Sequence, residues 1–390
     1  MSGSILIVDD EINILKSLKR LLFETNYSVF TAENGIEALE ILEKKQIDLI
    51  ISDIKMPAMD GYQLLKRVKE KHPDTITLIL SGYVEKELIF KLIQENLSNL
   101  CVIKPWDNTH LLAIVNRLFY IRNKFAAINL SKILTCSREI NNLEEPFYFE
   151  LVDNLEKGSN IDLIINTIEK DPVLTVRILS FVNNIYKLNT ASLKKALDYL
   201  SMDELKNIII HAVLSNINKL GKSRYKEHLT LSHVTSELVY HIYNGFLHKK
   251  IPENFKNIGA LAYIGEIFTE CQYKQEFNKI IHISKKENNP LNNASKTILM
   301  ISFQQITVYL LKWWNIPDYI SEIIFSLDDP LNNKVKNKEL ASVLHIAVYH
   351  SYELFGIIPY RLKKETYNFL NLDEEKIYNY NFLIQAGDHK

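Results

Sequence analysis

The first third of the chain alternates short apolar runs with stretches in which apolar residues recur at helical spacing. The apolar runs are rich in Ile, Leu and Val and lie at 5–8, 28–32, 49–53, 75–80 and 101–103. Such runs predict strands buried on both faces. The intervening patterns predict helices over 13–24, 36–44 and 85–96. Two further helices are predicted, one that Asp60 caps at its N-terminus and one that begins at Asn108. This alternation predicts a parallel sheet with right-handed crossovers.

The helix that begins at Asn108 has no evident stop signal. Apolar residues continue at helical spacing from Leu111 to Ile133, with neither Gly nor Pro before Pro146. We therefore expect one long helix that bridges two domains. A flexible linker is the alternative, but it would be richer in Gly, Ser and Pro.

Beyond about residue 146 the strand pattern disappears, and the chain to about 354 reads as helices joined by short polar turns. Asp171 followed by Pro172 is a clear helix start. No fixed-period repeat is evident. We divide the chain into a first domain at 1–122, a helical linker at 123–145, an all-helical domain at 146–354 and a C-terminal helix and tail at 355–390, with the last residues disordered.

Polar residues follow the predicted strands of the first domain, and they suggest its chemistry. Asp9 and Asp10 follow the first strand, Asp53 ends the third, and Ser81 and Lys104 end the next two. The carboxyl ends of parallel strands meet at one sheet edge, so these side chains should lie together. Clustered carboxylates favour a hard cation such as Mg²⁺. A carboxylate, a metal, an ammonium and a hydroxyl together suit a phosphoryl group.

Residues 3–122 resemble the receiver domain of two-component response regulators. The resemblance implies a flavodoxin-like fold with strand order 2-1-3-4-5. It makes Asp53 the phosphoacceptor, within a D-x-x-M-P motif, and Ser81 the switch hydroxyl. It makes Lys104, which precedes a proline, the phosphate-binding lysine. Its metal ligands are Asp9, Asp10, Asp53 and the backbone carbonyl of Lys55.

One residue departs from the receiver pattern. Three positions before Lys104 the family has Tyr or Phe, whereas this chain has Cys101. The resemblance therefore does not extend to the family's aromatic rotamer switch. It still implies a histidine kinase or phosphotransfer protein as partner, and a homodimer through the receiver.

The second domain resembles HDOD domains, all-helical signalling modules related to HD-type metal phosphohydrolases. The stretch from Glu169 to Asn184 resembles the signature DP-x-L-x-x-x-[IL]-L-x-x-x-N-S, and 192–210 resembles the next helix pair, with Ser201 where Gly is usual. Residues 310–317 resemble the L-L-x-x-W-x-[IL]-P turn. The resemblance covers about 146–354.

The ligands of a working HD phosphohydrolase are missing. The G-L-L-H-D-I-G segment corresponds to 259–265, where Ala262 and Tyr263 replace His and Asp, and a later His corresponds to Ser302. The chain has no His-Asp or His-His dipeptide. Activation of water against a phosphodiester needs such ligands. We therefore interpret the second domain as a protein-binding module without catalytic activity.

The remaining candidate residues fit structural roles better. We interpret five other histidines as surface residues or as hydrogen-bonded core residues rather than metal ligands: His228, His233, His241, His345 and His350. We interpret Trp313, Trp314 and Tyr309 as core residues with one exposed aromatic side chain, rather than as an aromatic cage for a ligand. The Lys doublets at 194–195, 249–250 and 285–286 read as solvated faces.

Composition narrows the function further. The 390 residues suit two or three domains, and 47% hydrophobic with 24% charged residues is typical of a globular protein. A net charge of −1 argues against direct nucleic-acid binding. We find no membrane span, no signal peptide and only three scattered cysteines, so we expect a cytoplasmic bacterial protein.

The preferred interpretation is a response regulator that a histidine kinase phosphorylates on Asp53 and that signals through a non-catalytic HDOD module. Two alternatives stay open: a cyclic-dinucleotide phosphodiesterase of the HD type, and a scaffold that works without phosphorylation. The sequence does not identify the kinase, the stimulus, the downstream partner or any small ligand of the HDOD domain.

Overall fold

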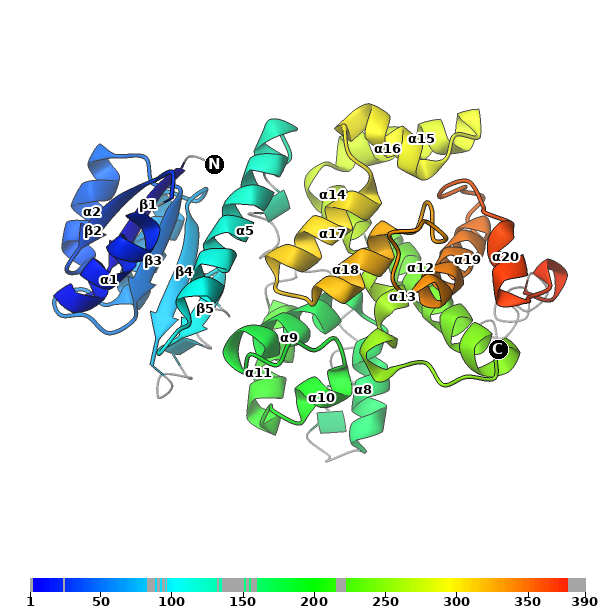
Figure 1. The fold of residues 1–390 in the computed structure, drawn as a ribbon, viewed down its shortest axis with the longest axis horizontal. Coiled ribbons are helices and arrows are strands. Elements are labelled where there is room, and N and C mark those ends of the chain that lie inside the picture. Colours follow the sequence, from blue (N-terminus) through cyan, green and yellow to red (C-terminus); the bar gives the residue numbers. More distant parts are fainter. Residues whose placement is uncertain are drawn as a thin grey trace. The chain divides into compact units, whose positions relative to one another are not determined.

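The computed structural model describes residues 3–23, 25–82, 88–89, 92, 95, 97–131, 133–134, 151, 154–155, 160–214 and 222–377. The chain forms two compact units, Met1–Ala127 and Ile128–Lys390. Each unit is described by itself (Figure 1).

The first unit is built on a five-stranded parallel sheet with the order β2-β1-β3-β4-β5. The strands are β1 (Gly3–Val8), β2 (Tyr27–Ala32), β3 (Leu49–Asp53), β4 (Ile76–Ser81) and β5 (Leu100–Ile103). The three inner strands are almost wholly buried, because helices cover both faces of the sheet. The predicted flavodoxin-like fold and strand order are confirmed.

Helices α1 (Ile12–Phe23) and α5 (Asn108–Ala127) contact each other, and so do α2 (Gly35–Lys44) and α3 (Gly61–Lys71). Right-handed crossovers give this pairing on the two faces of a sheet of this order. Asn34 caps α2 and, as predicted, Asp60 caps α3 through its side chain. Most of the helix expected over 85–96 lies outside the described residues.

The expected continuous helix between the domains is wrong. Helix α5 ends at Ala127, and the chain turns at Asn129, whose backbone is left-handed with φ of 57°. An α-helix does not continue through that conformation. Leu130 and Ile133, which extend the apolar pattern, are buried and belong to the second unit. Residues 132 and 135–145 of the predicted linker lie outside the described part.

The second unit is helical, and its described residues contain no strand. Its α-helices are α8 (Ile161–Glu169), α9 (Pro172–Ile185), α10 (Leu193–Leu197), α11 (Met202–Leu214), α12 (Lys222–His241), α13 (Ile258–Leu261), α14 (Ile264–Gln272), α15 (Lys274–Glu287), α16 (Leu291–Leu299), α17 (Phe303–Trp313), α18 (Asp318–Phe325), α19 (Lys338–Glu353) and α20 (Glu365–Leu370). A π-helical turn follows α12, and a 3₁₀ turn, Glu253–Phe255, precedes α13.

Helix α9 begins as the sequence predicts. The Asp171 side chain accepts hydrogen bonds from the backbone N–H groups of Val173 and Leu174, and Pro172 occupies the first turn. Both faces of α9 are largely buried, so it is a core helix of the unit. None of the described helices is long and apolar enough to cross a bilayer.

The chain beyond residue 354 packs into the same unit. The Nδ1 of His345 lies 2.6 Å from the Leu327 carbonyl, and its Nε2 accepts a hydrogen bond from the Lys363 N–H. The ring also stacks on Tyr360, with centroids 4.8 Å apart. Burial holds the pKa of His345 at about 4, so the imidazole is neutral and ties the C-terminal segment to α19. The predicted final helix is confirmed as α20, and residues 378–390 lie outside the described part.

Candidate functional site at the carboxyl edge of the sheet

The sheet register brings the predicted site residues to one edge. Val8 is opposite Ser52, so Asp9, which follows β1, and Asp53, the last residue of β3, lie at the same level. Asp53 is opposite Leu80, which precedes Ser81. Ser81 is in turn opposite Ile103, which precedes Lys104. The carboxyl ends of the adjacent strands β1, β3, β4 and β5 therefore present these residues together.

Lys104 lies between two carboxylates. Its Nζ is 2.9 Å from Asp9 Oδ2 and 3.0 Å from Asp53 Oδ1. Asp9 is completely buried, and its other oxygen accepts the Glu11 N–H at 2.9 Å. Asp53 is 8% exposed. One ammonium thus balances two carboxylates that are nearly removed from water.

The protonation equilibria reflect this arrangement. Burial raises the pKa of Asp53, although the hydrogen bond and charge of Lys104 oppose the rise and the charge of Asp9 adds to it. For Lys104 burial alone would lower the pKa. The hydrogen bonds and charges of Asp9 and Asp53 outweigh burial and raise the pKa above its ordinary value.

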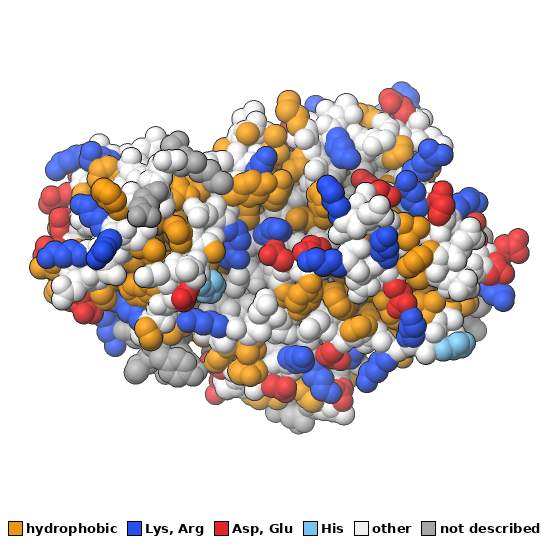
Figure 2. Space-filling model, in the orientation of Figure 1, with side chains coloured by type: hydrophobic (Ala, Val, Ile, Leu, Met, Phe, Trp, Pro, Cys, Tyr) orange, Lys and Arg blue, Asp and Glu red, His pale blue; other side chains and the backbone are white. Residues whose placement is uncertain are grey.

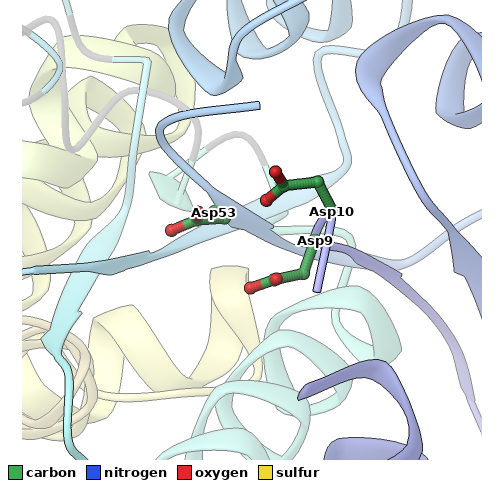
Figure 3. Close-up of side chains that lie close together, drawn as sticks. All are labelled: Asp9, Asp10 and Asp53. Atoms are coloured by element: carbon green, nitrogen blue, oxygen red, sulfur yellow. The ribbon is translucent and has the colours of Figure 1, made fainter. Parts of the chain in front are cut away.

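Asp10 completes a group of three carboxylates. Each of Asp9, Asp10 and Asp53 offers an oxygen, and these oxygens lie within 4.8 Å of one another. Figure 3 shows the three side chains extending from β1 and β3 into the same space. Asp10 is exposed, so the cluster is open to solvent on one side. An all-oxygen donor set with an open side fits Mg²⁺, which keeps several of its waters.

Ser81 and Lys55 lie beside this cluster. Ser81 is fully buried at the end of β4, and its hydroxyl donates to the Gly82 carbonyl at 3.1 Å. Lys55 lies in the loop just after Asp53 and is exposed to solvent. Cys101 is buried within β5, one strand further along the sheet.

Gly61 is a positioning residue that the sequence reasoning missed. A Cβ at Gly61 would lie 2.2 Å from the Asp53 carbonyl oxygen, far inside van der Waals contact. Its N–H also donates to the Ile54 carbonyl at 2.7 Å. Only glycine lets α3 begin so close to the strand that carries Asp53. The available signal was a glycine directly after the cap residue Asp60.

In the second unit, Tyr263 and Ser302, two positions that we expected from the sequence to match HD ligands, serve in packing and capping. Tyr263 is 1% exposed, and its hydroxyl lies 2.5 Å from Thr235 Oγ1, which donates to Ser351 Oγ at 2.7 Å. Ser302 is the N-cap of α17 in a capping box with Gln305. These hydroxyl groups make no ligand set for a transition metal.

A buried acidic pair lies next to Tyr263. Tyr352 donates a hydrogen bond from its hydroxyl to Glu266, and burial raises the Glu266 pKa to about 7. Glu270 Oε2 is 2.7 Å from His228 Nε2. His350 lies 2.5 Å from both the Glu353 carboxylate and the Tyr367 hydroxyl. In the described residues, the receiver carboxylates are the one group of three or more His, Cys, Asp or Glu placed to hold a metal.

The face drawn in Figure 2 carries no dominant charge. On the face drawn in Figure 2, Lys and Arg side chains alternate with Asp and Glu over the coloured residues of both units. This agrees with the net charge of −1, and the described residues on this face form no extended basic stripe of the kind that binds phosphate backbones.

The comparisons with known proteins find two families. Residues 5–116 match the response regulator receiver domain, and residues 148–330 match the HDOD domain. The DNA-binding transcriptional regulator NtrC of Escherichia coli K12 is 35% identical over 115 residues, which are 30% of this chain and 24% of NtrC. The sporulation initiation phosphotransferase F of Bacillus subtilis 168 is 38% identical over 89 residues, 23% of this chain and 72% of that protein.

A solved structure gives a further match. The signal receiver domain of an HD domain-containing protein from Pseudomonas fluorescens Pf-5 is 32% identical, with a TM-score of 0.31. It covers 32% of this chain and 99% of that one. The chain spans about a quarter of the length of the NtrC-type relatives it matches.

Proposed function

We propose a function from the premise that this chain belongs to the response regulator receiver family and carries an HDOD domain. The chain accepts a phosphoryl group on Asp53 and signals through the HDOD domain. The observation that supports this best is the position of Lys104, within 3.0 Å of both Asp9 and Asp53 at the carboxyl edge of the sheet. A nearly buried carboxylate beside a fixed cation is suited to nucleophilic attack on phosphorus.

The donor is a histidine kinase or a phosphotransfer protein that carries phosphohistidine. An oxygen of Asp53 forms a bond to phosphorus as the phosphorus–nitrogen bond of the donor breaks, and the released imidazole takes up a proton. Lys104 moves from its bond with Asp53 to an oxygen of the phosphoryl group. Ser81 turns its hydroxyl from the Gly82 carbonyl to another of those oxygens.

The carboxylates of Asp9, Asp10 and Asp53, with the backbone carbonyl of Lys55, would hold Mg²⁺. When bound, Mg²⁺ supplies positive charge that offsets the charge of the phosphoryl oxygens. The exposure of Asp10 leaves room on that side for retained water ligands.

The phosphoryl group biases a local two-state surface. Movement of Ser81 and Lys104 pulls the loops after β4 and β5 inward, around the fourth and fifth helices of the receiver. That surface changes how the HDOD domain is presented to a downstream protein in the cytoplasm. We keep the proposed limits of 1–122 for the receiver, 123–145 for the linker, 146–354 for the HDOD domain and 355–390 for the C-terminal segment.

We infer that the HDOD domain binds protein and has no catalytic activity. Tyr263 fills the place of an HD metal ligand with a fully buried phenol whose hydroxyl is engaged by Thr235. A cyclic-dinucleotide phosphodiesterase would need metal ligands there. Hydrolysis of such a dinucleotide by the purified chain would contradict this assignment.

Phosphorylation is tested with a small phosphodonor such as acetyl phosphate and Mg²⁺, followed by intact-mass measurement. We expect one added phosphoryl group on the wild type and none on Asp53→Asn. Asp74→Asn, an exposed acid after α3, is the matched control and should label fully. Full labelling of Asp53→Asn would overturn the assignment of Asp53, and no labelling of the wild type would favour a phosphorylation-independent scaffold.

Transmission is tested by hydrogen–deuterium exchange of the full chain with Mg²⁺, with and without beryllofluoride, which mimics the aspartyl phosphate. Protection at Asp53, Ser81 and Lys104 together with altered exchange in residues 160–377 is the expected result. Protection confined to residues 3–127 would contradict signalling through the HDOD domain.

A further inference from the structure

A pocket of about 780 Å³ lies in the second unit, lined by the start of α17, by α18 and by the loop from α18 to α19 (Figure 1). Phe255 and Tyr319 both line it, with their rings edge to face and centroids 5.4 Å apart. Ile323 and Val335 add aliphatic surface, and Phe325 in the same lining is 58% exposed. A pocket of this size has room for several large side chains, and covering its apolar lining is favourable because water is released.

The acids of this pocket are all paired. Three carboxylates line it, and each lies 3.5 to 3.8 Å from a lysine Nζ: Glu322 with Lys336, Asp328 with Lys296, and Asp329 with Lys363. Lys334, the remaining charged group of the lining, is exposed to water and forms no ion pair within the described part of the chain. An uncharged apolar occupant would leave all three pairs in place, whereas a charged occupant would compete with them.

The C-terminal part of the chain passes close to this pocket. The His345 imidazole contacts a carbonyl of the loop that lines the pocket and accepts the N–H of Lys363. The next residue, Lys364, places its Nζ 3.0 Å from Glu374. Ile377, three residues further on, is buried and is the last residue of the described part. The described chain therefore ends within a few side-chain lengths of the pocket.

The ten residues after Ile377, which we call the tail segment (378–387), carry no charge. Apolar or aromatic side chains occupy every second position of its first half: Tyr378, Tyr380, Phe382 and Ile384. In an extended chain, residues two apart share a face, so the segment would present one largely aromatic face. At about 3.3 Å per residue, Ile384 can reach about 23 Å from Ile377. The tail segment therefore has the composition and the reach to enter the pocket.

We propose that the tail segment occupies this pocket in the same chain. Phe382 packs against Phe255 and Tyr319, and Ile384 lies beside Val335. The apolar side chains leave water, and no charge enters the pocket. A tethered segment has a high effective concentration at a site within its reach, so even a weak contact is well populated. A second copy of the chain, or another protein, would have to displace the tail segment first.

The contact rests on the packing of the second unit and not on phosphorylation of Asp53. It therefore stands or fails independently of the proposed function.

Disulfide trapping in the full chain tests the position of the tail segment. The test chain carries Ile384→Cys with Val335→Cys, and peptide mass spectrometry follows bridge formation under mild oxidation. The control chain carries Ile384→Cys with Glu365→Cys, an exposed position outside the pocket; the three native cysteines are common to both chains. A freely moving tail would reach position 365 at least as readily, because the neighbouring Lys364 contacts Glu374 near the start of the segment. We expect the bridge to form at least tenfold faster in the test chain.

Further substitutions in the test chain distinguish docking from random collision. Tyr380→Ser with Phe382→Ser removes two side chains of the apolar face and should slow bridge formation at least fivefold. Asn379→Ser with Asn381→Ser, the matched change on the opposite face, should leave the rate unchanged. Phe325→Asp places a charge in the pocket lining at an exposed position and should slow bridge formation as well, with an unchanged circular dichroism spectrum.

Two results would overturn the proposal directly: equal bridging rates in the test and control chains, or a fast bridge that persists after Tyr380→Ser with Phe382→Ser. A mixture of isotope-labelled and unlabelled test chains shows whether the bridge forms within one chain or between two. Bridges within one chain are the expected result. Bridges between two chains would assign the pocket to a second copy, which also contradicts the proposal.

Discussion

Replacement of Lys104 by Met tests the electrostatic account of the site. The change keeps most of the side-chain bulk but removes the one cation that contacts both Asp9 and Asp53. Asp9 would keep only the Glu11 N–H on its other oxygen, and Asp53, which is 8% exposed in the wild type, would lose its cation. Without Mg²⁺ we therefore expect the receiver to lose stability.

The magnitude follows from the geometry. Breaking a buried ion pair by removal of one partner costs about 3–5 kcal/mol. The Lys104 side chain is 20% exposed, so water recovers part of the loss and removal of the lysine also ends its own desolvation cost. We expect about 2 kcal/mol, which corresponds to a roughly 30-fold faster exchange of the most protected amides.

Hydrogen exchange of β1, β3 and β5 in the full chain measures this loss within the receiver alone. Lys71→Met is the control, because Lys71 is exposed at the end of α3. The difference in stability between the wild type and Lys104→Met should shrink as pH falls, because a protonated carboxyl carries no charge that a cation must balance. Burial already raises the Asp53 pKa, so this stability difference begins to shrink at a pH above the ordinary pKa of a carboxyl. Exchange rates equal within twofold at pH 7 would refute the reasoning.

Three further changes give separate outcomes. Gly61→Ala should lower the unfolding free energy by about 1–3 kcal/mol and slow phosphorylation of Asp53, because the new Cβ would overlap the Asp53 carbonyl. A Cβ at Gly82 would meet open space, so Gly82→Ala should change stability little. Urea unfolding of the two variants measures this difference. The Glu266 pKa of about 7 lies above its unfolded value, so its contribution to stability is complete at low pH and is lost as pH rises through 7. Between pH 5.5 and 8 the wild type should therefore lose about 2 kcal/mol more than Glu266→Gln in denaturant titrations, and parallel pH profiles would contradict this. Asp171→Ala removes the acceptor of two N–H groups at the start of α9 and should cost about 1–2 kcal/mol by urea unfolding, whereas Asp171→Asn, which can still cap, should cost less.

The receiver could be predicted from the sequence because each signal is local. Apolar runs fix the strands, and the polar residues that end them inevitably meet at the carboxyl edge of a parallel sheet. The ion pairs of Lys104 with Asp9 and Asp53 follow from that topology. Gly61 was missed because its role depends on an approach between backbones that no side-chain pattern records.

The end of α5 could not be predicted from periodicity. Apolar residues at helical spacing run through Phe125 and on to Leu130 and Ile133, but they serve two different cores. The division lies at Asn129, a residue that tolerates the left-handed conformation as well as the helix. Likewise, the burial of Glu266 and its bond to Tyr352 join residues 86 positions apart and leave no trace in local sequence.

The hydroxyl chain around Tyr263 bears on the evolutionary history of the second unit. Tyr263, the residue just before α14, lies within hydrogen-bond distance of Thr235 of α12, and Thr235 donates a hydrogen bond to Ser351 of α19, so one phenol links these two helices to the start of α14. Replacement of that phenol by an aspartate would open a void and place a carboxylate in a buried site. A replacement of Tyr263 by a metal-ligating residue would therefore cost stability, and this cost limits which residues the position can accept during evolution.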